Sequence, residues 1–250
     1  MGIKIGCAAW TWTEPAHNPP YEEAIKSIGE LGFDGIELIL RDFEDVENYW
    51  TKDKRKEIKS MVDYYGLQVS QFAMFQNVMD GLASLEEEKK NRSIEAFKNG
   101  CEISADLGCD IVNFVSPWPS TVTAPNSYLP EYYYINVPGV DPRIRALQVF
   151  QTKLKYTFPK PFDWERYWSS HVDAVRKVAQ IAKQYGFKLA IENHANTMTP
   201  HTDSILRLCE EVGELTKMRQ NRTAEPAGSA VFSCINARYI VCACKIPLFS

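Results

Sequence analysis

The stretch Leu31-Gly32-Phe33-Asp34-Gly35-Ile36-Glu37-Leu38-Ile39-Leu40 contains the end of one predicted element and the whole of the next. Gly32 suits the left-handed position that closes a helix, because glycine has no Cβ to clash there. The apolar run at 35–40 begins shortly after it, as is usual for a helix-to-strand loop. Its nearly continuous apolar character is typical of a parallel strand covered on both faces. The stretch therefore predicts a helix end, a tight turn and a buried strand.

The same unit recurs along the chain as a helical stripe, a glycine and an apolar run. The later glycines are Gly66, Gly108 and Gly186, and the runs that follow them are 69–75, 111–115 and 189–192. Apolar residues recur with helical spacing before each glycine, over 21–31, 58–65, 94–105 and 164–182. With 3–9 as a first strand, the alternation of strands and helices predicts right-handed βαβ units and an α/β fold.

The pattern changes towards the C-terminus. Residues 202–212 predict a fifth helix, but the following 214–223 are polar where a strand is expected. Residues 214–250 carry two acids and five bases, whereas 1–213 carry 30 acids and 23 bases. We therefore divide the chain into a domain at 1–213 and a divergent tail at 214–250. The alternative is a divergent sixth strand at about 230–243.

The segment 116–160 is too long for a plain strand-to-helix loop and is rich in Pro and Tyr. It follows a strand end, which is where barrels and open α/β sheets bind ligands. A lid or an oligomer contact is one interpretation. An excursion that only packs on the barrel is the other.

Composition narrows the class of protein. The 250 residues are 45% hydrophobic with a formal net charge of −4, which gives no electrostatic footprint for nucleic acid. We find no apolar run long enough for a membrane span and no secretory signal. The seven cysteines are irregularly spaced and do not form a disulfide framework. We expect a cytoplasmic protein.

Two of the strand motifs resemble those of a known superfamily. Gly32–Leu38 on the second strand and Leu189–His194 on the fifth resemble motifs of the sugar isomerase/epimerase superfamily, the xylose-isomerase-like TIM barrels, and Gly6–Trp12 also fits. The resemblance covers about 1–213. It implies a (β/α)8 TIM barrel, which typically takes about 250 residues. Here the barrel is expected to be incomplete, with about five to six βα units, because five strands already extend to residue 193 and the 37 residues after Gly213 have room for about one more unit.

The resemblance also implies a chemistry. Members of the superfamily bind a divalent metal (Mn, Mg, Co or Zn) and move a proton at the carbon beside the carbonyl of a small sugar or sugar phosphate. A Lewis acid on the oxygen stabilises the enediolate, and a carboxylate acts as the base. Glu192 matches the strand-five Glu, which is both metal ligand and catalytic residue. The family's strand-six Asp, strand-seven His and strand-eight Glu have no counterpart in this sequence.

That incomplete match leaves several functions open. The chain is an isomerase or epimerase, or it is an inactive remnant or sugar-binding module of the same family. An abasic-site endonuclease relative is disfavoured by the acidic composition and by the presence of only four histidines. A homo-oligomer is compatible with every one of these functions.

Three polar residues are candidates for the site. Glu192 follows an apolar run and should project at the barrel mouth, although a helix cap or an ion pair is the structural alternative. His194 lies two residues further on and would point to the same side if the strand persists; it is a substrate-binding candidate or an exposed loop histidine. Glu37 lies inside an apolar strand and needs a partner. It orients a ligand, binds substrate or forms a structural ion pair.

The remaining substrate-binding candidates lie at strand ends. Trp10 and Trp12 flank the end of the first strand, where they form an apolar wall for a sugar or simply close the core. Candidates of the same kind on the third and fourth strands are Gln71, Phe72, Asn113, Ser116 and Trp118.

Overall fold

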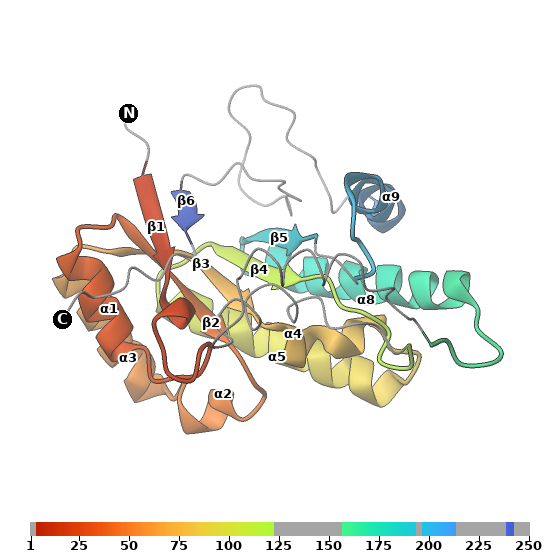
Figure 1. Cartoon of the computed structure of the whole chain (residues 1–250), viewed down its shortest axis with the longest axis horizontal. Helices are drawn as coiled ribbons and strands as arrows, with labels where there is room; N and C mark the ends of the chain where they lie inside the picture. Colours follow the sequence, from red (N-terminus) through yellow and green to blue (C-terminus); the bar gives the residue numbers. More distant parts are fainter. Residues whose placement is uncertain (1–3, 123–156, 194–196, 214–238, 243–250) are drawn as a thin grey trace, which may run out of the picture.

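A single parallel sheet organises the protein. The computed structural model describes residues 4–122, 157–193, 197–213 and 239–242 (Figure 1). The strands are β1 (Lys4–Ala8), β2 (Gly35–Leu40), β3 (Gln68–Met74), β4 (Ile111–Val115), β5 (Lys188–Glu192) and β6 (Tyr239–Cys242). The sheet order is β5-β4-β3-β2-β1-β6, and every pair is parallel. Consecutive strands from β1 to β5 are therefore neighbours, as in a barrel wall.

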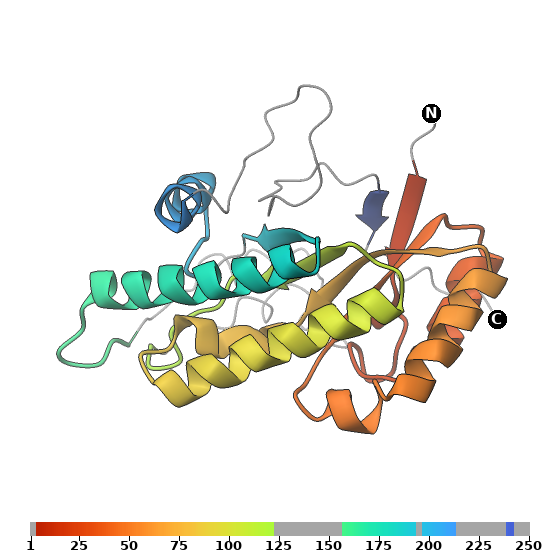
Figure 2. The same cartoon turned by 180° about the vertical axis from the view of Figure 1, so that it is seen from behind.

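Helices follow the strands as the sequence predicts. The longer helices are α1 (Glu22–Glu30), α3 (Lys52–Tyr64), α5 (Glu87–Asp106), α8 (Trp164–Gln184) and α9 (Thr202–Val212). The short helices are η1 (Ala9–Thr11), α2 (Asp45–Asn48), α4 (Gln76–Met79) and η2 (Asp80–Ala83). Figure 2 shows α5 and α8 lying in front of the sheet, whereas Figure 1 shows the sheet in front of them. These two helices thus cover the same face.

The core lies between the sheet and the helices. Ile25 of α1, Phe97 of α5 and Val175 of α8 are fully buried, as are Ile36 and Phe114 on the strands. The Phe97 and Phe114 rings meet edge to face, with centroids 6.3 Å apart. The apolar stripes of the sequence are thus the faces that the helices bury against the sheet.

The helix-closing glycines are confirmed. Gly32, Gly66, Gly108 and Gly186 all have positive φ, between 67° and 78°. An L side chain is disfavoured in this conformation, so glycine allows each helix to turn directly into the next strand.

The sheet is an incomplete barrel wall. β6 lies inside the range 230–243 of the alternative prediction and pairs with β1, so the structure contains that sixth strand. It lies beside the first strand rather than after β5. Within the described ranges, β4 is the only strand that pairs with β5. The separation of 1–213 from 214–250 stays a prediction, and most of the excursion at 116–160 lies outside the described residues.

Candidate functional site

A register shift between β2 and β3 sets up the first part of the site. Ile36 pairs with Val69, but the next residue, Glu37, pairs with Gln71, so Ser70 is an extra residue on β3. The Ser70 hydroxyl donates to the Ile36 carbonyl oxygen over 3.0 Å. Such a bulge re-aims the side chains that follow it. Here it brings Gln71 beside Glu37, and Gln71 Nε2 donates to Glu37 Oε2 over 2.8 Å.

Glu37 is a buried carboxyl with two hydrogen-bond donors. The residue is only 6% exposed. Besides Gln71, the Trp10 indole donates to it, from Nε1 to Glu37 Oε1 over 2.9 Å. Burial raises the pKa of Glu37 to about 7, the negative charge of Glu192 adds to the rise, and the Trp10 and Gln71 hydrogen bonds oppose it. A carboxyl of this kind can hold a proton near neutral pH, where an ordinary glutamate is ionised.

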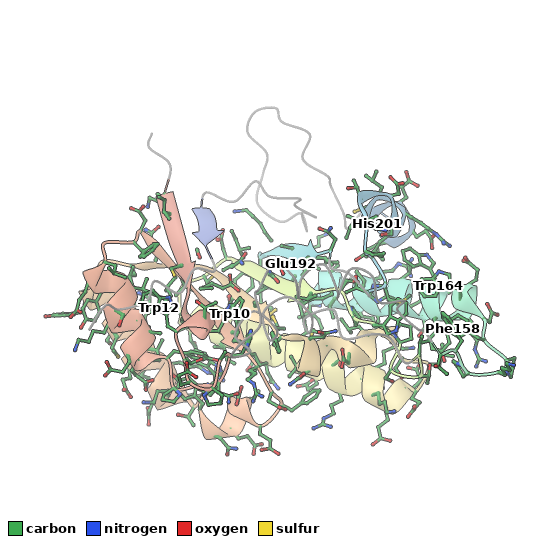
Figure 3. All side chains as sticks on the ribbon, in the orientation of Figure 1. Trp10, Trp12, Phe158, Trp164, Glu192 and His201 are labelled. Atoms are coloured by element: carbon green, nitrogen blue, oxygen red, sulfur yellow. The ribbon has the colours of Figure 1, made fainter. Side chains whose placement is uncertain are left out.

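Glu192 ends β5 and is the second carboxyl of the site. Asn113 Nδ2 on β4 donates to Glu192 Oε1 over 2.9 Å. The residue is exposed, and its backbone is fixed to the neighbouring strand end because Ser116 N donates to Glu192 O over 3.1 Å. Figure 3 shows Glu192 at the end of β5, near the centre of the molecule.

The two carboxyls lie on one face of the sheet. Glu37, Gln71, Asn113 and Glu192 are joined through side-chain hydrogen bonds and through the electrostatic influence of Glu192 on Glu37. Their strands β2 to β5 are consecutive in the sheet. Glu192 stands at the C-terminal end of β5, and the C-terminal ends of parallel barrel strands are where active sites lie, so this row is the candidate site. We call these four residues and Trp10 the carboxyl row.

The structure brings only part of the predicted set together. Trp10 and Glu37 meet directly, but Trp12 Nε1 instead donates to Cys7 Sγ over 3.2 Å. Cys7 pairs with Ile36, which faces the helices. The indole N–H of Trp12 is thus directed to Cys7 and not to the carboxyl row, and its role in substrate binding stays a prediction.

Of the candidates next to Gln71 and after β4, Phe72 and Trp118 lie apart from the carboxyl row, whereas the backbone N–H of Ser116 bonds Glu192 O. Phe72 is fully buried, and its ring lies 5.4 Å from that of Trp50. Phe72 is therefore part of the hydrophobic core and does not lie on the face of the sheet that carries Glu37. Ser116 is fully buried as well. Trp118 Nε1 donates to Val122 O, and its ring lies 5.9 Å from that of Trp164. His194 lies outside the described residues.

Sequence reasoning overlooked His17. Its ring is stacked on that of Trp10, with centroids 4.6 Å apart, and is tilted against that of Phe75, with centroids 4.9 Å apart. The available signal was a histidine in the proline-rich loop directly after the first strand. Histidine is one of the residues that tolerate the left-handed backbone, and the φ of His17 is 73°.

The described residues do not complete a metal site. Glu192 is a possible ligand with oxygen chemistry suited to a divalent cation. However, within 4–122, 157–193, 197–213 and 239–242, no three His, Cys, Asp or Glu side chains are grouped to hold an ion. We therefore derive no chemical step through a metal. The same ranges contain no helix that is long and apolar enough to cross a membrane.

Solved structures with a similar fold include several sugar epimerases. D-psicose 3-epimerase from Clostridium cellulolyticum H10 superposes with a TM-score of 0.58 at 15% identity, covering 84% of this chain and 60% of that one. L-ribulose 3-epimerase gives a TM-score of 0.57 at 17% identity, with 85% and 58% covered. For 3-keto-D-glucoside 4-epimerase from E. coli the TM-score is 0.53 at 17% identity, with 84% and 65% covered.

The similarity in fold therefore extends over most of this chain but less than two thirds of each of these structures. No curated protein matches the sequence. The family model described as xylose isomerase-like TIM barrel matches residues 25–219, which is most of the sequence. The chain belongs to the xylose isomerase-like TIM barrel family.

Proposed function

We propose that the carboxyl row binds a small sugar and exchanges a proton at the carbon beside its carbonyl, as a sugar isomerase or epimerase does. The observation that carries the proposal is the pair of carboxyls with different environments: Glu37 is buried and Glu192 is exposed. Pairs of titratable groups whose environments separate their pKa values supply the acid and the base of such reactions.

The proposed roles follow from those environments. Glu192, as an exposed carboxylate, takes the proton from the carbon, and the electrons of the C–H bond move into the carbonyl to form an enediolate. Glu37, which holds a proton near neutral pH, donates a hydrogen bond to the oxygen where negative charge develops. Glu192 then returns the proton to the same carbon, which gives exchange with solvent, or to the former carbonyl carbon, which gives an isomer once the hydroxyl proton has moved between the two oxygens. Gln71 and Asn113 orient the two carboxyls through the bonds described above.

A divalent metal would supply Lewis-acid stabilisation of the same enediolate. Glu192 would be one ligand, and the other ligands would come from beyond the described residues or from another chain. If none does, the protein is a sugar-binding member without catalysis. This second function is favoured by the finding that, in the described part of the chain, no three His, Cys, Asp or Glu side chains lie close enough together to hold a metal ion.

Solvent deuterium exchange separates the two functions. The purified full chain is incubated in D2O with D-psicose, D-fructose or L-ribulose, with Mn²⁺ or with EDTA, and the ketose is followed by NMR. We expect deuterium at the carbon beside the carbonyl. Glu192→Gln should abolish this exchange, and Glu37→Gln should slow it by about 100-fold, the lower end of the usual cost of losing an oxyanion donor.

Glu88→Gln is the matched control, because Glu88 is an exposed carboxylate in the first turn of α5. It should exchange at the rate of the unchanged protein. Ketose binding without exchange would favour the binding module. Neither binding nor exchange, in a folded protein, would refute the proposed function.

A further inference from the structure

His17 has an unusual backbone for its residue type. Within the part of the chain that the structure describes, it is the only non-glycine residue with positive φ, at 73°. Two hydrogen bonds hold this conformation: His17 N donates to Trp10 O over 2.9 Å, and Tyr21 Oη donates to His17 O over 3.0 Å. Non-glycine residues in the left-handed region are strained and occur preferentially at functional sites. The loop thus supports a strained residue at one point.

The strained backbone of His17 places its imidazole ring against the rings of Trp10 and Phe75. The His17 and Trp10 rings are nearly parallel, with an interplanar angle of 16° and centroids 4.6 Å apart. Phe75, which directly follows β3, lies on the imidazole at 4.9 Å. Burial and the nearby positive charge of Arg41 lower the pKa of His17, although a backbone hydrogen bond to Ala16 opposes this. A lowered pKa favours the neutral ring, which stacks without a charge.

The Trp10 ring held in this way is the one that reaches Glu37. Trp10 Nε1 donates to Glu37 Oε1 over 2.9 Å, and an indole has a single N–H, so the direction of this bond depends on the orientation of the ring plane. Trp10 is in the three-residue helix η1 and is only half-buried. The backbone of Trp10 does not fix the orientation of its indole ring, whereas the parallel imidazole of His17 restricts that orientation.

We propose that His17 is a positioning residue, whose stacked imidazole fixes the Trp10 indole so that its N–H meets the Glu37 carboxyl. The importance of this for ligand binding rests on the proposed function, in which Glu37 binds the substrate oxygen. The geometric part does not depend on that function. An alternative role, in which His17 only shapes the loop, predicts no effect on the Trp10 N–H once the loop is folded.

The test measures the indole N–H of Trp10 by NMR on the full chain labelled with ¹⁵N-tryptophan. Trp10→Phe identifies the signal. His17→Asn removes the ring and keeps a residue that tolerates positive φ. Phe75→Leu removes the second ring that contacts the imidazole and leaves His17 unchanged. We expect the Trp10 signal to shift and its hydrogen exchange to speed up about tenfold in His17→Asn, and to change less in Phe75→Leu.

His201→Asn is the matched control, the same substitution at the N-cap of α9. It should leave the Trp10 signal unchanged. If His17→Asn does not fold, Phe75→Leu decides the question. An unaltered Trp10 signal and exchange rate in the folded variants would overturn the positioning role.

Binding of D-psicose provides the second measurement. We expect His17→Asn to raise the Kd about tenfold, the scale of a hydrogen bond to a charged or acidic group. A change in the Trp10 signal without a change in Kd supports the positioning role and contradicts the use of Glu37 in binding. If the unchanged protein binds no ketose, the proposed function fails, and the Trp10 signal still decides the role of His17.

Discussion

Replacing Glu37 by Gln should make the stability of this protein less dependent on pH. The folded-state pKa of Glu37 is about 7, against an ordinary value of 4.5. A carboxyl whose pKa is raised by folding contributes stability below its unfolded pKa, and this stability is lost as the pH rises through the folded value. At about 1.4 kcal/mol for each pH unit, the difference is about 3 kcal/mol between pH 4.5 and 7. Glutamine has no proton to lose and escapes this cost.

The hydrogen bonds of the site allow this substitution. In Glu37→Gln, the side-chain oxygen can still accept from Trp10, while the new amide donates to Gln71 if the Gln71 amide turns over. No buried polar group is then left without a partner. The local environment therefore favours a neutral side chain at this position over an ionised one.

The assay is urea unfolding of both proteins in EDTA buffer, at steps from about pH 5 to pH 8. Relative to the unchanged protein, the variant should gain up to about 3 kcal/mol more at pH 8 than at pH 5. Glu88→Gln serves again as the control, with a constant difference across the series. The argument is refuted if the advantage of Glu37→Gln is the same at both ends, because Glu37 would then titrate as an ordinary carboxyl.

Three further predictions concern stability. His171 is fully buried with its pKa lowered to about 4, so the protein should lose about 3 kcal/mol as the pH falls from 6.5 to 4, and His171→Gln should remove this loss in acid unfolding curves. Gly81→Ala would bring its Cβ against the Lys89 carbonyl oxygen, and urea unfolding should show a loss of about 3 kcal/mol in the free energy of unfolding. In Gly100→Ala the nearest atoms to the new Cβ belong to the flexible Met74 side chain, so the loss should be about 1 kcal/mol. Equal losses in the two variants would contradict the steric explanation. Trp50→Phe removes the donor to Ile39 O and should lower the midpoint of thermal unfolding by an amount equivalent to about 2 kcal/mol, and an unchanged midpoint would contradict it.

The elements could be predicted because their signals are local. A glycine at the helix end and an apolar run after it need no tertiary information, and β2 begins and ends where the sequence indicates. The face of the sheet to which each side chain points could not be predicted in the same way. A parallel strand covered on both faces is apolar at every position, so its pattern does not tell which residues point to the helices.

Phe72 illustrates this limit. The extra residue Ser70 shifts the strand register, and no feature of the stretch Gln68–Met74 announces the shift. Phe72 consequently pairs with Leu38 in the core, and Gln71 takes the place beside Glu37. Glu37 was predictable as the one carboxyl within an apolar strand, but its partners Trp10 and Gln71 come from η1 and β3 and depend on the tertiary structure.

The strand β6 shows a different limit. The sequence around it lacks the glycine-and-strand unit, and its pairing with β1 joins residues far apart in the chain. Local patterns therefore left two alternatives for this region, a divergent tail or a sixth strand.

The bulge in β3 lets the strand contain one extra residue without changing which side chains face the ligand side. Deleting Ser70 alone would restore uninterrupted pairing, with Gln71 still opposite Glu37 and Phe72 still opposite Leu38. If Ser70 were instead paired with Glu37 and the bulge were lost, Gln71 would stand opposite Leu38 and Phe72 opposite Ile39. Every side chain from 71 to 74 would then exchange faces, which would turn a phenyl ring towards the ligand side and send an amide into the core. A slip of register at this point thus exchanges four side chains at once, whereas the loss of the Ser70 codon leaves all four on their faces.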